Sequence, residues 1–264
     1  MHNLSTVPAL HFPVYLHVGS WRIHPHWVFE ALAYFMAFRV YLTVRKRRGD
    51  TVPEPTRWTA IAAAAAGAAL GSKLLFLFEN PADTLQHLRD VTFLMGGKTI
   101  IGGLIGGLIA VELVKSHIGE RRSTGDLFVF PLIVGMAIGR IGCFLTGLPD
   151  HTFGIATSLS WGIDFGDGIR RHPTQLYEIV FLLALGSVLL TIRPRLTDSG
   201  DLFKLFMGAY LGWRFAIGFI QPEIPLAGLS AIQWACLGTL IYYTANFRNR
   251  VALSRTEPAT RTHG

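Results

Sequence analysis

Residues 127–146 read LFVFPLIVGMAIGRIGCFLT, an apolar run that a single charged side chain, Arg140, interrupts. About 20 apolar residues in a helix cross the roughly 30 Å hydrocarbon core of a bilayer. Six further stretches have the same character: residues 27–44, 58–78, 100–114, 173–192, 202–220 and 229–247. The sequence therefore predicts an all-α membrane protein, with seven transmembrane helices in a single domain over residues 1–247.

The overall composition agrees with a membrane location. The chain has 264 residues, of which 50% are hydrophobic and 16% are charged, whereas soluble domains carry about 25% charged residues. Its net charge of +7 comes from basic residues between the apolar stretches, where they indicate orientation in the membrane. We therefore expect a bacterial membrane as partner, and no nucleic acid.

Lysine and arginine are distributed unequally between the two sides of the predicted bundle. One side carries fourteen: Arg45, Lys46, Arg47, Arg48, Arg57, Lys115, Arg121, Arg122, Arg193, Arg195, Arg248, Arg250, Arg255 and Arg261. The other side carries four: Arg22, Arg89, Arg170 and Arg171. Because cytoplasmic loops are the more positive, we predict an external N-terminus, a cytoplasmic C-terminus and a basic, disordered cytoplasmic tail over residues 248–264.

The segments at about residues 11–24 and 148–172 alternate apolar and polar residues, a period typical of half-buried strands. The pairs Gly19-Ser20 and Asp167-Gly168 suit the turns beside those strands. We expect these segments to form a small periplasmic, β-rich cap over the helices.

Glycines four residues apart let transmembrane helices approach closely. Such pairs are Gly67/Gly71, Gly102/Gly106, Gly103/Gly107, Gly135/Gly139 and Gly208/Gly212. The two cysteines, Cys143 and Cys236, both lie within apolar stretches and lack the paired spacing of a disulfide framework or zinc site. The sequence thus predicts close helix packing, and neither a metal nor a cofactor.

Arg140 and Arg214 lie about a dozen residues from the cytoplasmic ends of their predicted helices. Ionisable groups at this depth face a partner or water, and two guanidinium groups suit a phosphate. Gln175 and Glu178 share a helical face on which the carboxylate can orient an arginine, and Tyr210 lies four residues before Arg214. The alternative is that each arginine only pairs with Glu178 or another internal acid.

Four motifs occur in a characteristic order. They are GGKTIIGGLIG at residues 96–106, GRIGCFLTG at 139–147, RHPTQLYE at 171–178, and GAY at 208–210 followed by Arg214. In order, spacing and predicted topology the chain resembles the bacterial prolipoprotein diacylglyceryl transferases over about residues 20–247.

This resemblance implies a multi-pass enzyme of the bacterial inner membrane. It would transfer the diacylglyceryl group of phosphatidylglycerol to the thiol of the lipobox cysteine in a preprolipoprotein, forming a thioether and releasing glycerol phosphate. It implies catalytic roles for Arg140, Arg214 and Tyr210, to which we add His172 as a catalytic residue. It also implies substrate-binding roles for Gln175 and Glu178, and we expect Lys98, Gly102, Gly103 and Cys143 to contribute to substrate binding.

Three positions depart from the family pattern: Ile101 replaces a histidine, Cys143 an asparagine and Gly218 an acidic residue. Because isoleucine cannot accept a proton, the usual base is missing. Substitutes are Lys98, Asp150, His151 and His172; we favour His172 as proton acceptor and Lys98 as a third cation.

These departures leave two other functions open. One is a family paralogue that binds anionic phospholipid, or transfers its diacylglyceryl group to a different acceptor. The other is a receptor or transporter without chemistry.

Overall fold

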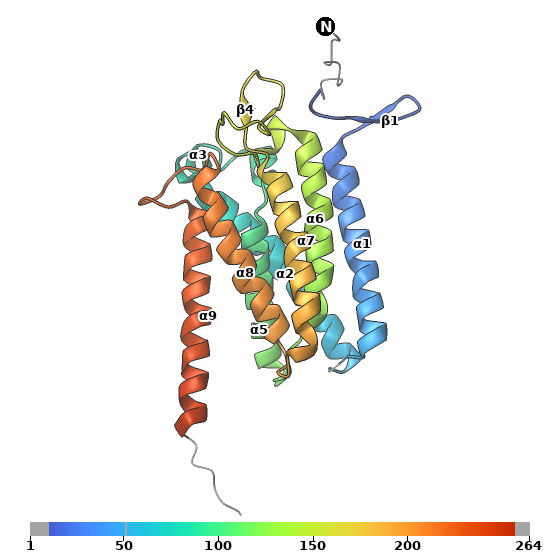
Figure 1. The fold of residues 1–264 in the computed structure, drawn as a ribbon, viewed down its shortest axis with the longest axis vertical. Coiled ribbons are helices and arrows are strands. Elements are labelled where there is room, and N and C mark those ends of the chain that lie inside the picture. The colour runs from blue at the N-terminus through green and yellow to red at the C-terminus, as the bar shows by residue number, and fades with distance from the viewer. Residues whose placement is uncertain (1–10, 51, 257–264) are drawn as a thin grey trace, which may run out of the picture. The chain divides into compact units, whose positions relative to one another are not determined.

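Long helices dominate the computed structural model, which describes residues 11–50 and 52–256 (Figure 1). Those at the seven predicted positions are α1 (Pro25–Arg48), α2 (Glu54–Glu79), α5 (Ile100–His117), α6 (Val129–Thr146), α7 (Thr174–Ile192), α8 (Asp201–Ile217) and α9 (Ala231–Thr256). Two short helices that the sequence did not predict, α3 (Pro81–Gln86) and α4 (Val91–Met95), lie between α2 and α5. Short 3-10 turns, η1 (Asp126–Phe128), η2 (Leu148–Asp150), η3 (Arg193–Arg195) and η4 (Gly218–Ile220), adjoin the long helices.

Local sequence explains where the helices begin and end. Pro25 occupies the first turn of α1, and Gly49, with φ of 74°, ends that helix. The Thr99 side chain caps α5 by accepting a hydrogen bond from the Gly102 amide at 3.1 Å. Gly147, with φ of 72°, ends α6.

Among the described residues, α1, α2, α5, α6 with η1, and α7 with η3 are long and apolar enough to cross a membrane. Large apolar side chains remain exposed along them, including Trp27, Leu70, Ile109 and Val180. Exposed apolar surface of this extent is typical of contact with lipid. The chain is therefore an all-α, multi-pass membrane protein.

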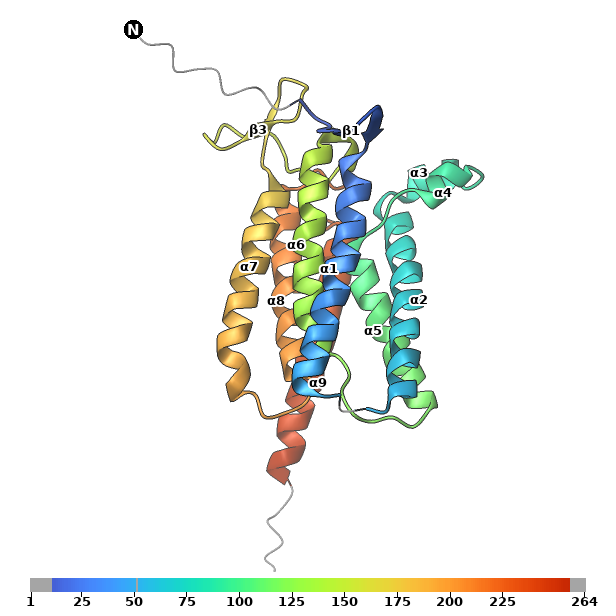
Figure 2. The same cartoon turned by 90° about the vertical axis from the view of Figure 1, so that its right-hand side faces the viewer.

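The chain forms two compact units, each described here by itself. In the first, made of residues 1–52, 122–206 and 219–222, α6 packs against both α1 and α7, and α1 and α6 lie side by side in Figure 2. Gly135 of α6 faces α1, because a Cβ built on it would lie 3.2 Å from Ala37 Cβ.

The predicted cap strands belong to the first unit and are short. β1 (Leu16–Val18) and β2 (Trp21–Ile23) form an antiparallel hairpin around Gly19, and β3 (Ile163–Asp164) pairs with β4 (Arg170–Arg171) around Gly168. Phe12 and Leu159, which the alternation placed in strands, lie outside them. The prediction of paired strands and glycine turns is confirmed, but their predicted lengths were too great.

The second unit contains residues 53–121, 207–218 and 223–264. Its centre is the packing of α2 against α5, with α9 contacting both. Gly67 and Gly71 of α2 meet Gly102 and Gly106 of α5 so closely that a Cβ on any of them would collide with the facing helix. This part of the small-residue prediction is confirmed.

For Gly139, Gly208 and Gly212 the packing prediction stays a prediction. Apart from chain neighbours and the backbone of the glycine's own helix, no heavy atom of a described residue lies within 4 Å of a Cβ built on any of them. Spacing alone identifies a small-residue face but not whether a neighbour covers it.

Helix α9 continues past residue 247 to Thr256, and the disorder expected of residues 248–264 stays a prediction. Within residues 231–256 there is no proline to end the helix, and the polar residues after 247 include the good helix former arginine. Residues 257–264 lie outside the described residues.

Candidate active site

In the first unit, Arg140 of α6 and Glu178 of α7 form a buried ion pair. Arg140 Nη2 lies 2.9 Å from Glu178 Oε2, and the two residues are 5% and 2% exposed. The contact between α6 and α7 brings the two helices together, and the carboxylate fixes the direction of the guanidinium group. Glu178 is thus the internal acid beside Arg140, and its role in orienting the guanidinium group toward a phosphate stays a prediction.

Gln175 lies one turn before Glu178 on α7 and is 1% exposed. Among the described residues, neither its Nε2 nor its Oε1 has a hydrogen-bond partner. Buried amide groups are nearly always hydrogen-bonded, because leaving them without partners costs about 1–3 kcal/mol. A bound molecule with both donor and acceptor groups would satisfy this side chain.

His172 is part of the cap. Its Nδ1 lies 3.2 Å from the Tyr177 hydroxyl, to which Trp161 Nε1 donates at 2.8 Å. Its backbone amide donates to the Ile155 carbonyl, and its carbonyl accepts from the Gly154 amide. These hydrogen bonds hold His172 in the cap, and its role as proton acceptor stays a prediction.

Cys143, one turn after Arg140 in α6, belongs to a cluster that the sequence did not reveal. His26 Nδ1 of α1 lies 3.1 Å from Asp150 Oδ1 in η2, and the Cys143 thiol and the Thr152 hydroxyl also donate hydrogen bonds to Asp150. Burial opposes the charge on Asp150, but these hydrogen bonds and the nearby His26 outweigh it and hold the pKa of Asp150 below its usual range. The one hint in the sequence was that His26 and Asp150 both flank the predicted external ends of helices.

In the second unit, Arg214 of α8 lies near an acid that sequence reasoning missed. Its Nη2 is 3.9 Å from Oε1 of Glu223, which follows η4 in the chain. Glu79, at the end of α2, interacts electrostatically with both residues. Tyr210, four residues before Arg214, is fully buried.

Gly218, where the resembled family has an acidic residue, lies beside a polar side chain. A Cβ on Gly218 would lie 2.9 Å from the Gln233 side chain, whose Nε2 donates to the Phe215 carbonyl at 3.1 Å. Glu223 and Gln233 come from later in the chain, which is why local spacing did not reveal them.

The first turns of α5 carry the remaining predicted residues. Gly102 packs closely against α2, whereas a Cβ on Gly103 would lie at ordinary contact distance, 3.6 Å, from the Ala68 carbonyl oxygen. The side chain of Ile101 is buried, since the residue is 1% exposed. Lys98 is exposed. Lys73 of α2 donates hydrogen bonds to the carbonyls of Gly96 and Gly97 and so holds the turn before α5.

The predicted site residues thus form two groups. Arg140, Cys143, His172, Gln175 and Glu178 belong to the first unit, whereas Lys98, Gly102, Gly103, Tyr210 and Arg214 belong to the second. A joint grip of Arg140 and Arg214 on one phosphate stays a prediction.

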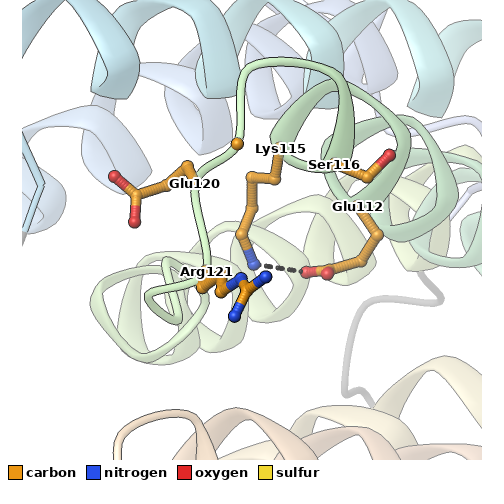
Figure 3. A pocket seen from close by; sticks show the side chains of 6 residues that line it. Glu112, Lys115, Ser116, Glu120 and Arg121 are labelled. Carbon is orange, nitrogen blue, oxygen red and sulfur yellow. Dashed lines mark hydrogen bonds and ion pairs between the residues drawn. The ribbon is translucent and has the colours of Figure 1, made fainter.

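A pocket of about 450 Å³ lies beside the end of α5 (Figure 3). Glu112, Lys115, Ser116, Gly119, Glu120 and Arg121 line it. Lys115 Nζ is paired with Glu112 Oε1 at 2.8 Å, and none of the predicted site residues lines the pocket. It offers no link to the candidate site.

Comparison with known proteins gives one consistent result. The family profile described as prolipoprotein diacylglyceryl transferase matches residues 13–247. A protein of Dehalococcoides mccartyi is 32% identical over 232 residues, covering 84% of this chain and 86% of its own. Proteins of Bordetella bronchiseptica and Methylobacillus flagellatus are each 33% identical, covering 84% and 87% of this chain and 88% and 92% of their own. All three relatives are named phosphatidylglycerol–prolipoprotein diacylglyceryl transferase.

Proposed function

The chain belongs to the prolipoprotein diacylglyceryl transferase family, and from this membership we propose its reaction. It transfers the diacylglyceryl group of phosphatidylglycerol to the thiol of the lipobox cysteine in a preprolipoprotein. The observation that carries this function is the family match over residues 13–247, which includes all four motifs.

The reaction joins sulfur to carbon. The thiolate of the acceptor attacks the glycerol carbon that carries the phosphate, a sulfur–carbon bond forms, and the carbon–oxygen bond to the phosphate breaks. The electron pair of that bond leaves with the phosphate oxygen as glycerol phosphate. The protein must therefore supply an ionised thiol and stabilise the charge that develops on the phosphate.

Arg140 and Arg214 bind that phosphate. A planar guanidinium group can hold two phosphate oxygens at once, and Glu178, 2.9 Å from Arg140, keeps the group in one orientation. The amide of Gln175, which has no partner among the described residues, hydrogen-bonds the bound headgroup. Tyr210 supports the phosphate from α8, one turn from Arg214.

The remaining predicted residues assist these groups. Lys98 is a third cation, and Gly102 and Gly103 shape the substrate site by bringing α5 close to α2. Cys143 and His172 act on the acceptor side of the site, and His172 is the predicted proton acceptor.

All seven long helices cross the inner membrane and form one functional domain, residues 1–247, with α8 and α9 completing the five spans described above. The N-terminus is periplasmic and the C-terminal tail cytoplasmic, because fourteen of the interhelical and tail lysines and arginines would then face the cytoplasm. The cap hairpins are consequently periplasmic, on the side where exported preprolipoproteins arrive.

The purified protein, labelled phosphatidylglycerol and a lipobox peptide provide the direct test, with an established family enzyme as positive control. We expect thioether product from the wild type. Arg140→Lys and Arg214→Lys should each lower the rate at least 100-fold, because lysine keeps the positive charge but lacks the planar guanidinium group that can hold two phosphate oxygens at once. Lys204→Gln, which changes a half-exposed side chain paired with Asp201, should retain the wild-type rate. No product from the wild type, or equal rates in all three variants, would contradict the proposal.

Complementation tests the function in cells. In a bacterium depleted of its own transferase, this chain should restore growth. If only the Ile101→His variant does so, the wild-type chain does not catalyse this transfer in cells, which would contradict the proposal.

A further inference from the structure

The first unit places three metal-ligating side chains together beside Arg140. They are His26 at the start of α1, Cys143 in α6 and Asp150 in η2, and one ligand atom of each lies within 4.8 Å of those of the other two. Tetrahedral zinc with bonds of about 2.0–2.3 Å holds its ligand atoms roughly 3.3–3.8 Å apart. The 3.1 Å contact between His26 Nδ1 and Asp150 Oδ1 therefore needs to open by less than about 1 Å.

The ligand types and surroundings favour zinc. A thiolate, an imidazole and a carboxylate are all common zinc ligands, whereas calcium and magnesium select oxygen. The other ring nitrogen of His26, Nε2, lies 3.8 Å from Glu30 Oε2. Zinc-binding histidines commonly have a carboxylate on the far side of the ring, where it sets the tautomer and the orientation.

The cluster can accept a fourth ligand. The His26 side chain is 40% exposed, whereas that of Asp150 is 7% exposed, so the cluster is anchored on one side and accessible on the other. Three protein ligands with one open position characterise catalytic zinc sites rather than structural ones.

We propose that His26, Cys143 and Asp150 bind a zinc ion whose open position takes the acceptor thiol of the lipid-transfer reaction. This inference rests on the proposed function. A thiol loses its proton when it coordinates zinc, and here the proton passes to water. The coordinated sulfur then displaces glycerol phosphate as described above, so that no oxidant or reductant is needed.

The position of the cluster suits this role. Cys143 follows Arg140 by three residues on α6, a spacing that brings the two Cβ atoms within about 5–6 Å of each other. A thiol bound at the cluster would therefore lie near the guanidinium group that holds the lipid phosphate. The same chain carries Ile101 where the resembled family has a histidine, and Cys143 where it has an asparagine. The two substitutions are then related: the histidine base is lost at Ile101, and a metal ligand is gained at Cys143.

Metal analysis of the full-length protein in detergent tests the site without relying on activity. After removal of metal by a chelator and dialysis against Zn²⁺, we expect about one zinc per chain. Replacement by Co²⁺ should give the thiolate-to-cobalt absorption band. Cys143→Asn, which installs the residue of the resembled family, should lose both signals, as should His26→Gln and Asp150→Asn. Cys236→Ser changes the other cysteine and should keep both, whereas Glu30→Gln should weaken binding about 10- to 100-fold.

Absence of zinc in the wild type, or its retention in Cys143→Asn, would overturn the site. The cluster would then be a hydrogen-bonded group without a metal.

Thiol binding has its own readout. A lipobox peptide should strengthen the cobalt absorption band, whereas the same peptide with serine for cysteine should not; an unchanged band would overturn the assignment of the open position. In the transfer assay at pH 7, zinc removal should slow the reaction about 30-fold, because a free thiol of pKa about 8.5 is only about 3% ionised. A rate independent of zinc would overturn the activating role. If the wild type binds zinc and thiol but forms no thioether, the metal site stands and the proposed function fails.

Discussion

Changing Glu178 to glutamine should destabilise the protein far more than the loss of an exposed ion pair would. The Arg140–Glu178 pair has a separation of 2.9 Å, with side chains 6% and 2% exposed. Removing one member of such a pair leaves the other charge buried without its ion-pair partner, which costs about 3–5 kcal/mol. For a chain of this size each kcal/mol lowers the melting temperature by about 2–4 °C, so we expect a decrease of about 6–20 °C.

The Lys204–Asp201 pair is a matched control. Its separation is 2.7 Å, but its side chains are 41% and 34% exposed, and exposed pairs contribute only about 0–1 kcal/mol. Thermal unfolding in detergent, followed by circular dichroism without added lipid, should therefore show a small shift for Lys204→Gln and a large one for Glu178→Gln.

The double variant Arg140→Gln/Glu178→Gln separates the loss of the pair from the cost of an isolated charge. It should recover much of the stability lost in Glu178→Gln, because it leaves no buried charge. The reasoning is refuted if Glu178→Gln melts within about 2 °C of Lys204→Gln, or if the double variant loses the sum of the two single effects.

Three further predictions follow from other contacts. Gly106→Leu should lower the unfolding free energy by about 1–3 kcal/mol, because its side chain would collide with the backbone of α2, whereas Gly208→Ala should be nearly neutral in the same unfolding experiment. Lys73→Met should increase hydrogen exchange in the turn before α5, since its ammonium group donates to the carbonyls there; unchanged exchange would show that the turn needs no tether. Asp167 has a lowered pKa, mainly because it accepts hydrogen bonds from Arg171, so this contribution to stability should be complete above about pH 4 and disappear as the pH falls through the lowered pKa. The melting temperatures of wild type and Asp167→Asn should therefore differ at pH 7 and converge near pH 2, and a difference that grows in acid would contradict this sign.

The sequence by itself determined the parts of this protein that depend on neighbouring residues. Helix positions follow from apolar length and from terminal signals such as Pro25 and Gly147, because both act within one or two turns of the chain. The orientation of an arginine by Glu178 was foreseeable for a related reason. A buried charge needs a partner, and few acids occur within the apolar stretches.

Only the tertiary structure decided which distant residues meet. His26, Cys143 and Asp150 are too widely separated for any local spacing rule to connect them, and the packing of α1 against α6 unites them. Glu223 reaches Arg214 from beyond the end of its helix. Likewise, the glycine spacing at Gly67/Gly71 and Gly208/Gly212 is identical, yet the first pair meets a facing helix, whereas among the described residues no facing helix lies within 4 Å of a Cβ built on the second. Spacing along a helix specifies a face, whereas the partner of that face depends on how the whole chain packs.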